Sequence, residues 1–143
     1  MSGTFAEGAS RFVVRVCYAD TDQMGFVYYG NYLRWFEIGR TEMLRERGMS
    51  YREVEAAGIR MPVLEARCSY RRPARYDDLV AIETELAGRT RASLSFRYRI
   101  RRESDGELLA EGATEHCFLD AAGRPVRPPA FFRELLARRT AAG

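Results

Sequence analysis

Apolar and polar residues alternate strictly between Ser93 and Arg102. Large apolar side chains occupy one face and serine or arginine the other, namely Leu94, Phe96, Tyr98 and Ile100 against Ser95, Arg97, Arg99 and Arg101. A period of two over this length predicts a strand in an antiparallel sheet with one solvated face. Apolar, β-branched or alternating composition predicts four further strands, over residues 11–18, 62–70, 78–88 and 108–120.

A longer period, of three to four residues, runs from Asn31 to Arg47 and predicts a helix. The residues at this spacing are Tyr32, Trp35, Phe36, Gly39 and Met43. The first half of the helix is apolar on almost all sides, which is typical of a buried helix. Glycine in mid-helix costs about 1 kcal/mol relative to alanine, so we expect a sheet to approach Gly39 closely. We expect Asn31 to cap the helix start and Gly48 to end the helix.

Two short helices complete the pattern. Ser50 and Glu53 form a capping box that predicts a helix to about residue 57, and Pro128-Pro129 precede an amphipathic stretch that predicts a terminal helix. This order of elements predicts an α+β protein in which a five-stranded antiparallel sheet is wrapped around one long buried helix. The arrangement resembles the hotdog fold. Such a sheet has an unpaired edge, and dimers commonly form by joining edges.

The composition fits a single folded domain over residues 1–143, with a packed core over about residues 11–135. Hydrophobic residues make up 46% of the chain and charged residues 30%, which excludes a disordered protein. The apolar runs are too short for a membrane-spanning helix, so we expect no integral membrane segment. The N-terminus does not have the pattern of a secretory signal, so we expect a cytoplasmic protein.

Residue counts exclude several chemistries. All 23 basic residues are arginine, which excludes a Schiff-base or P-loop lysine. The net charge is only +3, and arginines are interspersed with acids, so we expect no nucleic-acid partner. One histidine, His116, and three widely spaced cysteines, Cys17, Cys68 and Cys117, offer almost no zinc ligands, so we expect no metal. We expect His116 to be packed or paired, and the cysteines to be reduced and buried as small apolar residues.

Two aspartates, Asp20 and Asp22, lie in a turn-rich segment just before the long helix. A helix start presents unpaired N–H groups and the positive end of the helix dipole. Such donors can stabilise charge on a carbonyl oxygen, and a neighbouring aspartate can act as a general base or a nucleophile. An aspartate before a helix is also commonly only a turn or cap residue. We expect Asp20 to shape the loop by hydrogen bonding.

The spacing of residues in this segment is specific. The matching positions are Tyr18, Asp20, Asp22, Gly25, Val27, Asn31 and Tyr32. In these positions the chain resembles the acyl-CoA thioesterases of the 4-hydroxybenzoyl-CoA thioesterase group, which includes the Tol-Pal-associated bacterial thioesterases. The aromatic-rich helix that follows and the segment 70–79 continue the resemblance over about residues 11–135. It implies the hotdog fold, hydrolysis of an acyl-CoA to free acid and CoA, no cofactor, and a homodimer or homotetramer with its active site at a dimer interface.

The resemblance also implies catalytic roles for individual residues. Asp22 is the general base or nucleophile, and the backbone amide of Tyr29 polarises the carbonyl. Tyr18 packs against or orients the aspartate, and Gly30 binds substrate. The Tol-Pal-associated members often have histidine where this chain has Tyr29. A histidine-assisted mechanism is therefore disfavoured, because tyrosine does not become charged near neutral pH as histidine does.

Three further residues are candidates for substrate contact. Glu37, on the long helix, either contacts substrate or is a paired core acid. Arg89 and Arg91 lie between the third and fourth strands, where the resemblance places the CoA phosphates, and guanidinium geometry suits phosphate. Two other functions stay open: an acyl-carrier-protein thioesterase of a biosynthetic pathway, and a non-catalytic acyl-CoA-binding protein.

Overall fold

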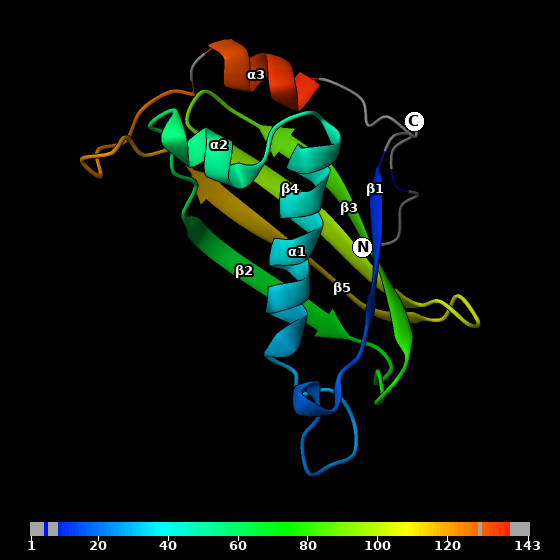
Figure 1. Cartoon of the computed structure of the whole chain (residues 1–143). Helices are drawn as coiled ribbons and strands as arrows, with labels where there is room; N and C mark the ends of the chain where they lie inside the picture. Colours follow the sequence, from blue (N-terminus) through cyan, green and yellow to red (C-terminus); the bar gives the residue numbers. More distant parts are fainter. Residues whose placement is uncertain (1–4, 6–8, 129, 138–143) are drawn as a thin grey trace.

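The computed structural model describes residues 5, 9–128 and 130–137 (Figure 1). Its elements are β1 (Ser10–Arg15), the 3-10 turn η1 (Tyr18–Asp20), α1 (Asn31–Glu46), α2 (Tyr51–Ala56), β2 (Val63–Tyr70), β3 (Leu79–Arg89), β4 (Ser93–Arg102), β5 (Leu108–Cys117) and α3 (Ala130–Ala137). The predicted strand over Ser93–Arg102 is confirmed residue for residue as β4. The other predicted elements are confirmed within a few residues at their ends.

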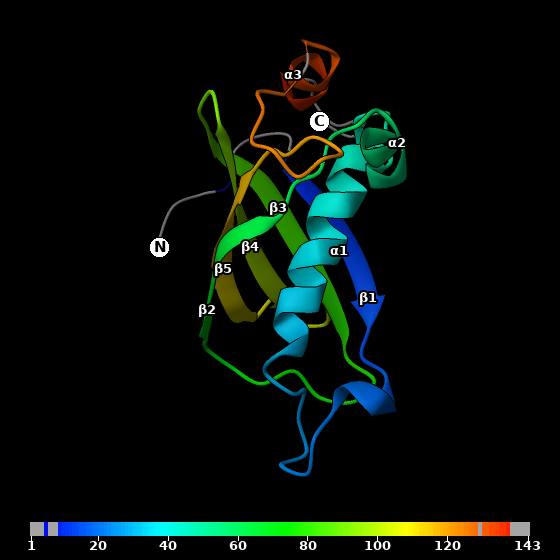
Figure 2. The ribbon, with the colours of Figure 1, turned by 90° about the vertical axis from the view of Figure 1, so that its left-hand side faces the viewer.

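The five strands form one antiparallel sheet in the order β1-β3-β4-β5-β2. The sheet curves around α1, which crosses one of its faces, while α2 and α3 lie at one end (Figures 1 and 2). This arrangement confirms the predicted α+β hotdog fold. β1 and β2 form the two edges of the sheet. Within the described ranges, no helix is long and apolar enough to span a membrane.

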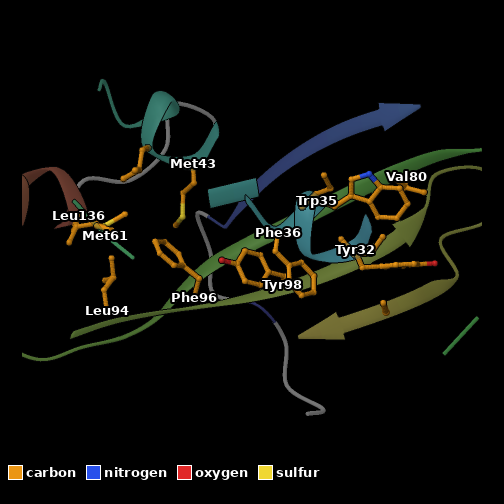
Figure 3. Packing of buried hydrophobic residues seen from close by; sticks show 14 of the residues in the cluster. Tyr32, Trp35, Phe36, Met43, Met61, Val80, Leu94, Phe96, Tyr98 and Leu136 are labelled. Carbon is orange, nitrogen blue, oxygen red and sulfur yellow. The ribbon is translucent and has the colours of Figure 1, made fainter. Parts of the chain in front are cut away.

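The core lies between α1 and the inner face of the sheet (Figure 3). Phe36 of α1 stacks on Tyr98 of β4, with ring centroids 4.3 Å apart and planes inclined by 9°. A Cβ atom at Gly39 would lie 2.7 Å from Cγ2 of Ile82 and closer still to Oγ1 of Thr84. The predicted close approach at Gly39 is therefore confirmed, and contact with β3 offsets the low helix propensity of glycine.

The start of α1 differs from the prediction. Gly30 is the N-cap residue, and Asn31 is already helical. The Asn31 side chain donates to the carbonyl of Asp20 at 2.8 Å, so the predicted cap is wrong because this side chain reaches back into the loop. Leu33 is 43% exposed, so burial of the first half on almost all sides is also wrong. The end agrees with the prediction, since Gly48 follows the last turn with a φ of +106°.

His116 is fully buried on β5. Its Nε2 lies 2.8 Å from Oγ1 of Thr114, and its Nδ1 lies 3.3 Å from the carbonyl oxygen of Met61. The Thr114 hydroxyl also bonds the Tyr98 hydroxyl at 2.6 Å. Burial, and secondly the positive charge of Arg40, lower the pKa of His116 to about 4. The prediction of a packed histidine is confirmed, and its ring is neutral near pH 7.

The three cysteines carry free thiols. Cys68 on β2 and Cys117 at the end of β5 are partly buried. Cys17 is exposed, because it follows β1 at the point where the chain leaves the sheet. The expectation of a buried thiol is wrong at this position.

Candidate active site

Asp20 holds the loop between β1 and α1 in shape. Its carboxylate accepts a hydrogen bond from the N–H of Cys17 at 2.8 Å and pairs with Arg34 of α1 at 2.7 Å. Its carbonyl oxygen accepts from the N–H of Tyr28 at 2.9 Å and from the side chain of Asn31 at 2.8 Å. Asp20 therefore ties the turn, the far side of the loop and the helix together, which confirms its expected structural role.

Asp22 lies in the same loop and keeps one carboxylate oxygen available. Its Oδ1 accepts from the N–H of Met24 at 2.8 Å. Thr21 and Val27 pair across the loop, and the N–H of Asp22 donates to the carbonyl of Phe26 at 3.0 Å, so the backbone around the carboxylate is held on both sides. The side chain is half-buried, and no residue that the structure describes forms an ion pair with it. Its second oxygen can therefore accept a proton or attack an electrophile.

Two backbone N–H groups at the start of α1 lack an acceptor. Among the described residues, neither Tyr29 nor Gly30 donates its N–H, and the first donor is Asn31, which bonds the carbonyl of Tyr28 at 3.0 Å. Both free N–H groups lie at the positive end of the α1 dipole. The side chain of Tyr29 raises the pKa of Tyr28, and the carboxylate of Asp22 adds to this effect. Asp22 therefore lies near the hydroxyl of Tyr28, in the loop that leads directly into α1.

An apolar cavity of about 390 Å³ opens beside the helix start. The loop, α1, the end of β2 and the residues after it supply the lining, which comprises Phe26, Val27, Tyr29, Tyr32, Tyr70, Arg71, Arg72 and Pro73. Only the two arginines bring charge to these walls. A hydrogen bond to a charged oxygen is stronger in such surroundings than in water. The cavity can thus hold an apolar group next to N–H donors that favour developing negative charge.

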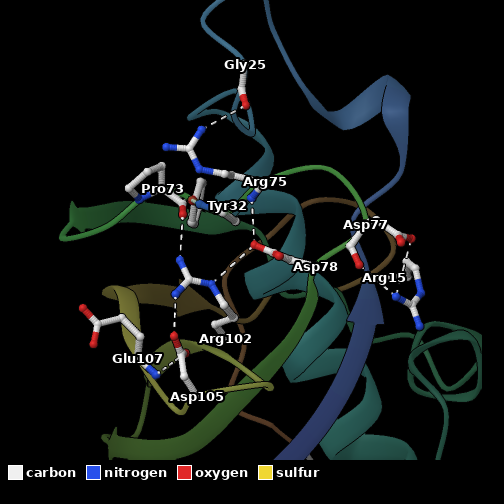
Figure 4. Close-up of polar contacts among 11 residues, drawn as sticks. Arg15, Gly25, Tyr32, Pro73, Arg75, Asp77, Asp78, Arg102, Asp105 and Glu107 are labelled. Atoms are coloured by element: carbon white, nitrogen blue, oxygen red, sulfur yellow. Dashed lines mark hydrogen bonds and ion pairs between the residues drawn. The ribbon is translucent and has the colours of Figure 1, made fainter.

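The segment that follows β2 holds the cavity wall against the loop and the sheet (Figure 4). The N–H of Val27 donates to the carbonyl of Ala74 at 2.9 Å, and the N–H of Ala74 donates to the Tyr32 hydroxyl at 3.2 Å. Arg102, at the end of β4, donates to the carbonyl of Pro73 at 3.2 Å. The cavity is therefore part of the rigid scaffold, and a ligand meets walls that are already in place.

A model of the thioesterase-like superfamily matches residues 16–136. The chain belongs to this superfamily. It is 34% identical over 127 residues to the acyl-CoA thioesterase YbgC of Haemophilus influenzae, a match that covers 88% of this chain and 90% of the relative. It is 28% identical over 95 residues to the 4-hydroxybenzoyl-CoA thioesterase of Pseudomonas sp., with 64% and 67% covered. The structure of the DHNA-CoA thioesterase from Staphylococcus aureus has a TM-score of 0.82 at 31% identity, with 88% and 85% covered. The predicted group is confirmed.

The remaining candidate site residues of this thioesterase-like chain lie in the loop before α1 and on α1 itself. Tyr18 is 79% exposed, and its ring packs on Tyr76 with centroids 5.4 Å apart. A Cβ atom at Gly30 would lie 2.7 Å from the ring of Tyr28, so glycine at this position allows that ring to pack against the helix start. Glu37 is exposed, and its interpretation as a paired core acid is wrong because the sheet covers the opposite side of α1. Within the described part of the chain, no cluster of His, Cys, Asp or Glu could hold a metal ion.

Arg89 and Arg91 lie at the opposite end of the sheet from the loop. With Arg127 and Arg133 they line a second cavity of about 320 Å³. In the described chain no carboxylate pairs with these four guanidinium groups, so the cavity suits an anion. β3 extends between the two ends over 11 residues, a span of about 36 Å. This thioesterase-like chain therefore carries Asp22 in the loop that leads into α1 but keeps these four arginines at the other end of the sheet.

Proposed function

We propose that this protein hydrolyses acyl-CoA thioesters to a free acid and CoA, at the site formed by Asp22, the start of α1 and the apolar cavity. The observation that carries the proposal is the pair of N–H groups at Tyr29 and Gly30, which bond no acceptor among the described residues. They lie at the start of α1, beside the apolar cavity that Tyr29 lines and directly after the loop that carries Asp22. The names of the relatives, acyl-CoA thioesterase among them, support the same substrate class.

The reaction needs charge stabilisation at the carbonyl oxygen and attack at the carbonyl carbon. In the proposed complex the thioester oxygen accepts hydrogen bonds from the N–H groups of Tyr29 and Gly30, and the acyl group occupies the cavity. As a general base, Asp22 takes a proton from water while the water oxygen attacks the carbonyl carbon, and collapse of the intermediate releases CoA thiolate. As a nucleophile, a carboxylate oxygen of Asp22 attacks the carbonyl carbon, the C–S bond breaks and CoA thiolate leaves, which gives an acyl anhydride; water then hydrolyses the anhydride to the free acid and regenerates Asp22. Both routes use the same N–H donors, and Tyr18 orients the loop that carries the aspartate.

Binding of the CoA phosphates to Arg89 and Arg91 requires a second copy of the chain, because one copy keeps them at the far end of the sheet. The outer edge of β2 has no neighbouring strand in the described chain, and β2 exposes Val63, Leu64 and Tyr70. Antiparallel pairing of two β2 strands would bring the cavity end of one copy to the arginine end of the other. We therefore propose a homodimer, alone or paired into a homotetramer, with residues of both copies at each site.

Removal of the two turn arginines is expected to weaken substrate binding without slowing the chemical step. The double variant Arg89→Ala/Arg91→Ala should raise KM for an acyl-CoA about tenfold or more, since charge-assisted phosphate contacts are lost, and should leave kcat within about twofold. Steady-state kinetics on purified protein measure both constants. The variant Arg52→Ala/Arg124→Ala removes the same charge from other exposed positions and should change neither. An unchanged KM in the first variant contradicts the phosphate contact.

The function itself is tested by a thiol-release assay on the wild-type protein. Short, long and aromatic acyl-CoAs are offered beside the same acyl groups on an acyl carrier protein, and free thiol is measured by a colour reaction. We expect turnover of at least one acyl-CoA, with a higher kcat/KM than for its carrier-protein counterpart. A preference for the carrier protein would favour the biosynthetic alternative. Saturable acyl-CoA binding without thiol release would favour the non-catalytic alternative and contradict the proposal.

The cytoplasm is the proposed location of this activity. Cys17, Cys68 and Cys117 are all free thiols, and Cys17 is exposed. Exposed free thiols persist in a reducing compartment, whereas secreted proteins commonly pair them. A cytoplasmic site also suits a substrate that carries a CoA thioester.

A further inference from the structure

Tyr70 connects the edge strand β2 to the helix start. It is the last residue of β2, and its hydroxyl donates a hydrogen bond to the carbonyl oxygen of Tyr29 at 2.9 Å. That carbonyl also accepts from the N–H of Tyr32 at 3.3 Å, as part of the first helical turn. A side chain 41 residues away in the sequence therefore contacts one of the two peptide units that carry the free N–H groups.

The peptide unit concerned is the one between Tyr29 and Gly30. A peptide is planar, so the carbonyl of Tyr29 and the N–H of Gly30 turn together. A hydrogen bond on the carbonyl restricts the plane and polarises the N–H on its other side, which makes that N–H a stronger donor. The preceding unit, which carries the N–H of Tyr29, is restricted in the same way, because the carbonyl of Tyr28 accepts from Asn31 at 3.0 Å.

The ring of Tyr70 is held independently of its hydroxyl. It lies edge-on to Tyr29, with centroids 6.3 Å apart, and edge-on to Tyr32, with centroids 5.1 Å apart. Both interplanar angles are close to a right angle, at 88° and 90°. Partial burial, and secondly the neighbouring Cys68, raise the pKa of Tyr70 well above its ordinary value. The hydroxyl therefore keeps its proton near neutral pH and remains a donor.

We propose that Tyr70 is a positioning residue: by holding the carbonyl of Tyr29, its hydroxyl aims the N–H of Gly30 at the thioester oxygen. This inference rests on the proposed thioesterase function. The bond acts most strongly when negative charge develops on that oxygen in the transition state, because a polarised donor gains more from a charged acceptor than from a neutral carbonyl. Loss of the hydroxyl is therefore expected to lower kcat rather than to raise KM.

The test is Tyr70→Phe, which keeps the ring and removes only the hydroxyl. Loss of a whole oxyanion donor costs roughly a hundredfold or more in kcat, and Tyr70 acts only through its effect on one donor. We expect kcat to fall about tenfold and KM to stay within about twofold. Tyr76→Phe removes the hydroxyl of another exposed tyrosine, one with no hydrogen bond to the described residues, and should leave both constants unchanged.

A second measurement is independent of turnover. In ¹⁵N-labelled protein, the backbone amide signal of Gly30 should shift in Tyr70→Phe, because the bond on the adjoining carbonyl is lost, and should stay in place in Tyr76→Phe. An active wild type with unchanged kcat in Tyr70→Phe overturns the inference, as does a higher KM at constant kcat. If the wild type releases no thiol, the proposed function fails, and the Gly30 signal alone tests whether Tyr70 holds the peptide between Tyr29 and Gly30. A shift then supports the anchoring of the peptide, and a fixed signal overturns it.

Discussion

Asp22→Asn is expected to lower kcat for thioester hydrolysis at least about a hundredfold, the scale on which a general base or nucleophile contributes. Asparagine keeps an oxygen that can accept from the N–H of Met24, the bond that Oδ1 makes in the wild type at 2.8 Å. The loop should therefore keep its shape, and no ion pair in the described chain is broken. Thiol release measures the loss, and a thermal unfolding curve close to that of the wild type establishes that the variant is folded.

A matched control for this substitution lies far from the loop. Asp120 also accepts backbone N–H groups with its side chain, from Ala122 and Arg124, each at 2.9 Å. Asp120→Asn makes the same chemical change in a similar turn and should leave kcat unchanged. Near-normal turnover in folded Asp22→Asn protein would remove the aspartate from the mechanism. In the wild type, a burst of thiol ahead of acid release would identify Asp22 as a nucleophile, and its absence would favour the general base.

The second large effect concerns stability below neutral pH. The pKa of His116 is lowered from 6.5 to about 4 in the folded protein, so between these values the unfolded chain binds a proton that the folded chain does not. The contribution of the neutral ring to stability is therefore complete above pH 6.5 and is lost as the pH falls toward 4. Each pKa unit is worth about 1.4 kcal/mol, so the loss amounts to at most about 3 kcal/mol.

Urea unfolding of the wild type at a series of pH values between 7 and 4 measures this loss. His116→Gln lacks the titrating ring but keeps groups that can bond Thr114 and the carbonyl of Met61, which His116 contacts at 2.8 Å and 3.3 Å. The variant is expected to be less stable at pH 7, because it fills the site less well, and to lose less stability on acidification. Parallel curves for wild type and variant would mean that another group causes the acid sensitivity.

Local patterns in the sequence were sufficient to predict most of the fold. Strict alternation determined β4, because each apolar position there is buried and each polar position between them is partly exposed. The glycine at position 39 was a specific signal, since mid-helix glycine is unfavourable unless a neighbour takes the place of a side chain. The loop aspartates were also recognisable locally, because they lie at a characteristic spacing in the turn-rich segment just before the helix. Their roles in the reaction stay predictions.

Features that depend on distant segments were not predictable in this way. Tyr70 had no local signal that its hydroxyl would reach the carbonyl of Tyr29, which it contacts across 41 positions. Arg127 and Arg133 join Arg89 and Arg91 only because the chain after β5 returns to the turn between β3 and β4. In a chain whose basic residues are all arginine, no single arginine stands out. Only the three-dimensional arrangement brings these four together in one cavity, where they form no ion pair with the described carboxylates.

The apolar cavity and the arginine-lined cavity lie at opposite ends of the sheet, and this separation affects how substrate specificity can evolve. The common part of every CoA thioester and its variable acyl part would be recognised by residues that share no secondary-structure element. Substitutions at Phe26 or Val27, which line the apolar cavity, could then change the preference for the acyl group without weakening binding of the CoA part of the substrate. This division would allow a new acyl preference to evolve through changes in the apolar cavity, while binding of the CoA part that all the substrates share is retained.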